Sequence, residues 1–191
     1  MRLIKTGPYQ PGHYRLEVKE FASHNIPPYT ILSHTWDADP SNEVLFADIQ
    51  DAHATEKKGF VKLQYAFDQS VRDGYGWVWI DTCCINKDSS AELSEAINSM
   101  YVWYQRAAKC YAYMEGVPSD TDMSARQSLF TMSKWFTRGW TLQVRKIEEA
   151  DMSIRMLIVL QVSLTNPESP VSRCLSCYSG GLPTDPLLCY C

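Results

Sequence analysis

The sequence predicts an α/β fold built on a parallel sheet, because strand-like and helix-like segments alternate along it. A first strand is expected at residues 29–35. Between residues 56 and 72, apolar residues recur at spacings of three and four, which is typical of an amphipathic helix, and Asp73-Gly74 ends it. Aromatic and β-branched residues then run together at 77–81, which indicates a buried strand. A strand, a helix and a second strand make a βαβ unit, whose strands lie parallel.

A second strand-helix-strand repeat follows. Ser89 and Glu92 have the spacing of a capping box, so a helix is expected to begin there. Its apolar stripe reaches Tyr104, and another strand is predicted at residues 109–114. Residues 133–143 are expected to start a further helix or turn. The repeat supports the same α/β architecture.

Composition limits the function classes that are open. The chain has 191 residues, 45% of them hydrophobic, and a net charge of −4. That length suits one compact domain, or a small domain with a tail. Nucleic-acid binding is disfavoured because it needs a basic surface that displaces counterions from phosphates. The sequence has no apolar run long enough for a bilayer and no secretory signal, so we expect no membrane partner and a cytoplasmic location.

The aromatic residues are unevenly spread, and this predicts where the domain ends. All six Trp and all six Phe precede residue 144. Large apolar side chains bury the most area, so the last 48 residues are not expected to form a core of their own. We predict a lead-in at residues 1–28, a domain at 29–143, and a divergent, poorly ordered tail at 144–191.

Seven cysteines cannot all pair within one chain. Cys83, Cys84 and Cys110 lie in apolar, strand-like runs, where a thiol is usually a small buried hydrophobe. The tail cysteines have spacings that depart from those of zinc modules, so no metal site is predicted.

Polar side chains gather where the predicted strands end, which is where open parallel sheets bind ligands. Hydroxyl, imidazole, indole and carboxylate groups together suit a polar ligand with a flat ring. Two simpler interpretations stay open: Asp81 only caps the next turn, and His34 only satisfies a buried carbonyl. No resident cofactor is predicted, because no glycine-rich nucleotide motif is present. The candidate pocket residues are Ser33, His34, Trp36, Asp81, Cys83, Glu95 and Trp140.

Three blocks of the sequence resemble the fungal heterokaryon incompatibility (HET) domain. The first is Tyr29–Trp36. The second runs from Gly74 to Lys87 and continues through residues 94–104 and 110–113. The third is Trp135–Gln143. The blocks are long, ordered and rich in rare residues, and the resemblance covers residues 29–143.

The resemblance implies a protein of filamentous fungi that acts in non-self recognition and regulated cell death. HET domains resemble the Toll/interleukin-1 receptor (TIR) domain, which implies a flavodoxin-like, three-layer parallel sheet, here incomplete at its C-terminal end. Some TIR domains cleave NAD, so NAD is a possible substrate rather than a cofactor. The resemblance also implies protein partners or self-association through the domain.

The sequence departs from the family pattern at Val144, where the pattern has a glutamate. Cleavage of the glycosidic bond of NAD needs a carboxylate, which valine cannot replace. The catalytic residues are therefore unknown, and enzymatic activity stays open. Two alternatives are a non-catalytic, self-associating signalling module and an inert product of a defective gene model. In the latter, codons 144 and 145 would read as a splice donor, and residues 144–191 as translated intron.

Overall fold

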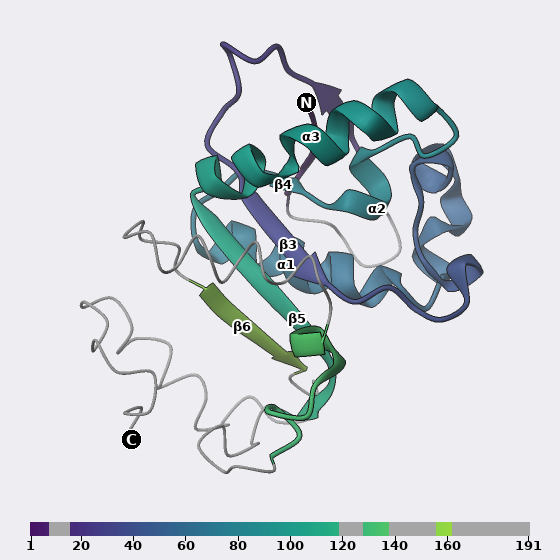
Figure 1. Cartoon of the computed structure of the whole chain (residues 1–191), viewed down its shortest axis with the longest axis vertical. Coiled ribbons are helices and arrows are strands. Elements are labelled where there is room, and N and C mark those ends of the chain that lie inside the picture. The colour runs from purple at the N-terminus through teal and green to yellow at the C-terminus, as the bar shows by residue number, and fades with distance from the viewer. Residues whose placement is uncertain (8–15, 119–127, 138–155, 162–191) are drawn as a thin grey trace.

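The computed structural model describes residues 1–7, 16–118, 128–137 and 156–161, and these form an α/β fold around one sheet (Figure 1). Six strands of the described residues lie in the order β2-β1-β4-β3-β5-β6. The strands are β1 (Arg2–Lys5), β2 (Val18–Glu20), β3 (Thr30–His34), β4 (Trp77–Trp79), β5 (Lys109–Pro118) and β6 (Met156–Gln161).

The sheet is mixed, so the prediction of a parallel sheet is correct only for its larger part. Strands β4, β3, β5 and β6 are parallel to one another, whereas β1 is antiparallel to both β4 and β2. Both antiparallel strands come from residues 1–28, in which the sequence interpretation placed no strand. Leu3 and Ile4 are fully buried in β1. Consecutive strands in this segment need no helical crossover, because the chain simply reverses between β1 and β2.

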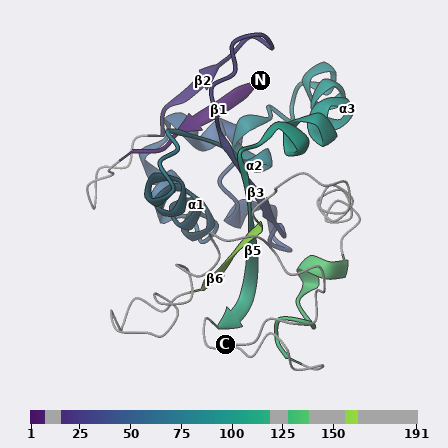
Figure 2. The same cartoon turned by 90° about the vertical axis from the view of Figure 1, so that its left-hand side faces the viewer.

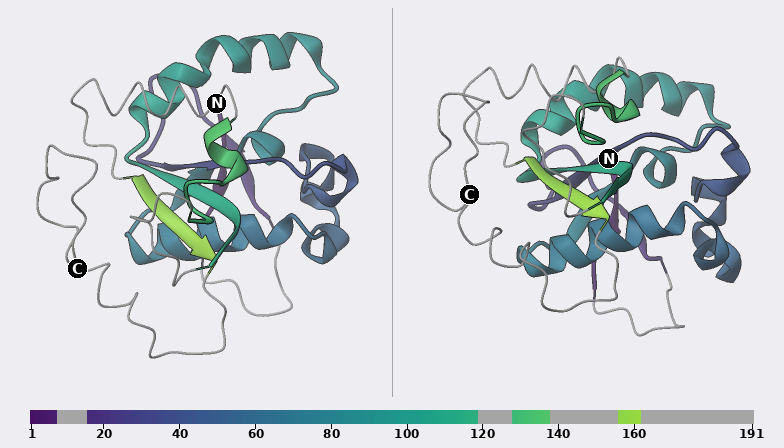
Figure 3. Two further views of the ribbon diagram at one scale, coloured as in Figure 1. Left: turned by 60° about the horizontal axis from the view of Figure 1, so that its bottom comes forward. Right: turned by 90° about the horizontal axis from the view of Figure 1, so that it is seen from below.

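Helices cover both faces of the sheet. Helix α1 (Phe60–Arg72) follows β3, and α3 (Ser90–Arg106) precedes β5, with the one-turn helix α2 (Asp81–Cys84) between β4 and α3. Figures 2 and 3 show α1 and α3 on opposite sides of β3 and β5. The short helices are η1 (Pro40–Asn42), η2 (Phe46–Gln50), η3 (Ala52–Glu56) and η4 (Lys134–Thr137).

The helix boundaries follow the signals in the sequence. Gly74 ends α1 with a φ of 81°, a left-handed conformation that glycine adopts without strain. At the start of α3, the Ser89 hydroxyl accepts a hydrogen bond from the Glu92 N–H at 3.4 Å. The Glu92 carboxylate accepts from the Asn86 N–H at 2.8 Å instead of closing the capping box. Local sequence signals therefore determine where α1 ends and where α3 begins.

One local prediction is wrong: Cys83 and Cys84 lie in a helix and not in a strand. The chain turns directly after Ile80, where the Cys84 N–H donates to the Ile80 carbonyl at 2.8 Å. Both thiols are nevertheless buried, as is that of Cys110 in β5. The turn ends β4 early and places Asp81 at the start of α2, at the edge of the sheet.

The core lies between the sheet and its two long helices. Trp79 of β4 is 1% exposed and makes edge-to-face contacts with Trp103 and Tyr104 of α3. On the other face, Leu63 and Phe67 of α1 are buried. Burying side chains of this size contributes about 1.5–3 kcal/mol each. These contacts hold β3, β4 and β5 side by side and so fix the positions of their carboxyl ends.

Strand β6 extends the sheet beyond β5, and it comes from the segment that the sequence assigned to the tail. The rest of residues 144–191 lies outside the described residues, so the domain boundary at residue 143 stays a prediction. In the described ranges, no helix combines the length and the apolarity needed to cross a bilayer.

Candidate functional site

A group of polar side chains lies at the carboxyl ends of β3 and β4, which are neighbouring parallel strands. We call His34, Trp36, Asp81 and Lys87 the strand-end cluster. His34 is the last residue of β3, Trp36 follows it, Asp81 begins α2, and Lys87 lies in the connection to α3. The two strands end at the same edge of the sheet, and this brings together residues that are more than 40 positions apart.

Trp36 holds the cluster together at the surface. Its Nε1–H donates a hydrogen bond to Asp81 Oδ2 at 2.9 Å. The Lys87 ammonium lies over the Trp36 ring, 3.5 Å from the ring centroid, in a cation–π contact. His34 Nε2 is 3.7 Å from Asp81 Oδ1, which is too far for a hydrogen bond.

Several buried atoms of this cluster lack hydrogen-bond partners among the residues that the structure describes. They are both ring nitrogens of His34, Oδ1 of Asp81 and Nζ of Lys87. The His34 side chain is only 1% exposed. Leaving a buried polar group unsatisfied costs about 1–3 kcal/mol, and such groups are rare in native proteins. Their concentration at one strand end makes this cluster the candidate site.

Burial also sets the charge of these side chains. Burial lowers the pKa of His34 below its ordinary value, although the nearby Asp81 carboxylate opposes the change. Burial likewise lowers the pKa of Lys87, again opposed by Asp81. A histidine with a lowered pKa is neutral at pH 7, so its ring offers one donor and one acceptor.

A buried ion pair lies beneath the cluster, and we call Glu43 and Lys62 the buried pair. Lys62 Nζ is 2.6 Å from Glu43 Oε1, with the side chains 4% and 1% exposed. Lys62 Nζ also donates to the Thr35 carbonyl at 2.8 Å, and the Asp37 N–H donates to Glu43 Oε1 at 2.6 Å. The pair thus holds the backbone on both sides of Trp36.

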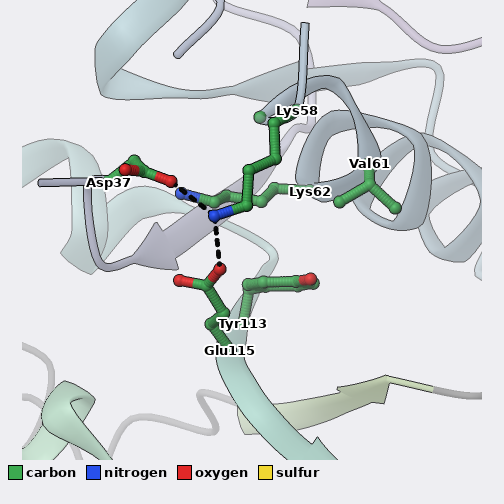
Figure 4. A pocket seen from close by; sticks show the side chains of 7 residues that line it. Asp37, Lys58, Val61, Lys62, Tyr113 and Glu115 are labelled. Carbon is green, nitrogen blue, oxygen red and sulfur yellow. Dashed lines mark hydrogen bonds and ion pairs between the residues drawn. The ribbon is translucent and has the colours of Figure 1, made fainter. Parts of the chain in front are cut away.

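A cavity of about 190 Å³ adjoins the buried pair at the carboxyl ends of β3 and β5 (Figure 4). Lys58 Nζ lies at its rim, 2.8 Å from Asp37 Oδ2 and 3.5 Å from Glu115 Oε1. Tyr113 forms a wall, and burial raises the pKa of its hydroxyl to about 12. The lining residues are Asp37, Lys58, Gly59, Val61, Lys62, Tyr113 and Glu115.

The seven sequence candidates have different positions in the structure. His34, Trp36 and Asp81 lie in the strand-end cluster. Ser33 is buried and accepts a hydrogen bond from Trp135 Nε1 at 3.1 Å, so it anchors a distant segment to β3. The Cys83 thiol donates to the Val44 carbonyl at 3.1 Å, and burial raises its pKa well above the ordinary value. A thiol in that environment is a poor nucleophile.

The other two candidates do not join the cluster. Glu95 is exposed on α3, and the described residues make no polar contact with it. Trp140 lies outside the described residues. The simpler interpretations also differ from the geometry. In the described part of the chain, the ring nitrogens of His34 bond to no carbonyl, and Asp81 accepts a hydrogen bond from Trp36.

Sequence reasoning missed three charged residues of the site: Glu43, Lys62 and Lys87. Lys62 is buried in helix α1 next to Leu63. From the sequence alone, a lysine in an amphipathic helix is assigned to the face that contacts solvent. Lys87 lies within the second block that resembles the HET domain but belongs to no motif of its own. Within the described part of the chain, no three His, Cys, Asp or Glu side chains are grouped to hold a metal ion.

Comparison with known protein families supplies the identity. The model of the family described as "Heterokaryon incompatibility protein (HET)" matches residues 29–131, more than half of the sequence. The chain belongs to the heterokaryon incompatibility (HET) family. All four residues of the strand-end cluster lie within the matched range.

A curated HET relative is similar over much of this chain. "Vegetative incompatibility protein HET-E-1" of Podospora anserina is 50% identical over 129 residues. The alignment covers 65% of this chain but only 9% of that protein. The comparison with solved structures found no match.

Proposed function

We propose that this chain acts in fungal heterokaryon incompatibility and the regulated cell death that accompanies it, through a HET domain that binds a small polar ligand. The observation that carries the proposal is the set of unsatisfied buried atoms in the strand-end cluster. They lie within the family match, at an edge of the sheet where α/β proteins bind ligands. The name of the curated relative supports the biological role.

NAD is the ligand we propose. The parallel strands β4-β3-β5-β6 have the order 2-1-3-4 when counted from β3, as in flavodoxin-like sheets and as a TIR-like fold requires. Ligands of such sheets bind where the first and third strands diverge, here between β3 and β5, and the cavity lies at that point. Trp36 is 41% exposed and offers an aromatic face for a flat ring.

The residue at position 144 decides whether this chain cleaves what it binds. Because Val144 replaces the expected glutamate, we propose binding without turnover.

Titration calorimetry with NAD, and chromatography of released nicotinamide, test this on the wild-type chain, Val144→Glu and Asp81→Ala. We expect wild-type binding without nicotinamide release, release by Val144→Glu, and weaker binding by Asp81→Ala. Absence of NAD binding to the folded wild-type protein would contradict NAD as the ligand. If Val144→Glu binds NAD without cleaving it, the proposal that the residue at position 144 decides turnover is wrong.

A non-catalytic, self-associating module is the second candidate. Helix α3 exposes Ile97, Tyr101 and Val102, between 38% and 44% each, which favours contact with another protein surface. Sedimentation of the purified chain tests it, with Ile97→Lys as the disrupting variant and Glu95→Lys as an exposed control on the same helix. A monomer at all concentrations would exclude self-association of this chain alone.

A further inference from the structure

We propose that the strand-end cluster recognises hydroxyl groups, and that its ligand carries a vicinal diol of the kind found in ribose. The inference deepens the proposed function, because it assumes that the cluster binds a ligand and specifies which part of the ligand it holds. It depends on which hydrogen-bond roles the unsatisfied atoms still offer.

Each unsatisfied group has a defined role. The Asp81 carboxylate only accepts hydrogen bonds, and the Lys87 ammonium only donates them. Neutral His34 does one of each. A group that meets all three must therefore both donate and accept. Hydroxyl groups do so without carrying a charge, whereas a phosphate diester lacks a donor and an ammonium lacks an acceptor.

Charge supports the same choice. A phosphate next to Asp81 would meet a like charge, and an ammonium next to Lys87 would meet another. His34 is also surrounded by opposite charges, because its pKa responds to Asp81 and Glu43 in one direction and to Lys62 and Lys87 in the other. Two carboxylates and two ammonium groups balance, so the cluster favours an uncharged, dipolar group over an ion of either sign.

The distance between His34 and Asp81 fits a bridging oxygen. Their nearest atoms, Nε2 and Oδ1, are 3.7 Å apart. One hydroxyl oxygen at roughly 2.8 Å from each atom can accept from Nε2–H and donate to Oδ1. Trp36 already binds the other oxygen of Asp81, at 2.9 Å, and so orients the carboxylate for this contact. A neighbouring hydroxyl of the same diol can then accept from Lys87.

Entry requires displacement of side chains at the surface. Trp36 is the most exposed member of the cluster, and Lys87 lies on its ring. A cation–π contact at a partly exposed position is a weak interaction. The Lys87 side chain can therefore swing off the indole at little cost, and the amine is then free to bind the incoming hydroxyl.

The experiment follows the Trp36 indole N–H by NMR, with the signal assigned by its loss in Trp36→Phe. The ligands are adenosine, 2′,3′-dideoxyadenosine, which lacks only the diol, and inorganic phosphate. We expect adenosine to shift the signal and the dideoxy compound to bind at least about tenfold more weakly, because the buried groups stay unpaired. Phosphate should leave the signal unchanged.

Asp81→Asn supplies a second measurement and Glu95→Gln its matched control. Asparagine keeps the acceptor for Trp36 but alters the charge balance, so adenosine affinity should fall at least about tenfold while Glu95→Gln has no effect. Equal binding of both nucleosides, or a shift caused by phosphate, would overturn the inference while leaving the proposed function intact. If neither adenosine nor NAD perturbs Trp36, both proposals fail, and water is the occupant of the cluster.

Discussion

The buried pair and the strand-end cluster lie on either side of the same backbone segment, yet they differ in how their polar atoms are satisfied. Lys62 has two acceptors within 2.8 Å, and Glu43 Oε1 has two donors at 2.6 Å. The ring nitrogens of His34, by contrast, have no hydrogen-bond partner in the described residues, although the side chain is equally buried.

Under the proposed function, the difference separates burial that stabilises the fold from burial that serves ligand binding. A satisfied buried network fixes one conformation of the chain, whereas an unsatisfied one destabilises the free protein and is compensated when a ligand supplies the missing bonds. The buried pair therefore positions residues 35–37. Because Trp36 belongs to this segment, the buried pair also positions the strand-end cluster. One atom departs from this division, because Glu43 Oε2 also lacks a partner.

The largest effect is expected from Lys62→Met. Removing one partner of a buried ion pair leaves the other charge uncompensated and costs about 3–5 kcal/mol. The free energy of unfolding, measured with urea, should fall by that amount at pH 7. Loss of less than about 1 kcal/mol would show that the buried pair is not what holds residues 35–37.

The double variant Glu43→Gln/Lys62→Met provides the control. It removes both charges but keeps an oxygen that accepts from the Asp37 N–H, so most of the lost stability should return. If the double variant is as unstable as Lys62→Met, the loss comes from packing and not from charge.

Gly59→Ala should have the next largest effect. A Cβ at this position would lie 2.7 Å from the Asn42 carbonyl oxygen and 2.8 Å from Glu43 Oε2. Because one of these atoms belongs to the backbone, the segment must shift, and overpacking of this kind costs about 1–3 kcal/mol. Urea unfolding measures the cost. An unchanged midpoint would mean that the start of α1 and residues 42–43 move apart freely, which contradicts a rigid buried pair.

The strand-end cluster should make the free energy of unfolding depend on pH through His34. Because burial lowers the pKa of folded His34, the unfolded chain binds a proton that the folded chain does not. Stability should therefore decline as the pH falls below about 6.5, with a slope of at most about 1.4 kcal/mol per unit. Asp81, Glu43, Lys62 and Lys87 act on this histidine. Unfolding curves at pH 5–7.5 should show the slope in the wild-type chain and a flatter one in His34→Gln; equal slopes would mean that His34 does not carry the effect.

Much of the fold was predictable from periodicity. Apolar spacing predicts helix α1 and the strands β3, β4 and β5. The sequence alone therefore places His34, Trp36 and Asp81 at strand ends. The antiparallel strands were not predictable in the same way, because a three-residue strand such as β2 has no measurable period. Lys62 was missed because its burial depends on Glu43, which only tertiary structure brings to it.

The smallest effect should come from Lys58→Met, which removes the ion pairs of a solvent-exposed lysine. Lys58 reaches Asp37 and Glu115 across the rim of the cavity, with 63% of its side chain exposed. Water and salt screen charges at such positions, so thermal unfolding should show no measurable change. A clear loss of stability would mean that the rim, and not the buried pair, holds Asp37 against α1.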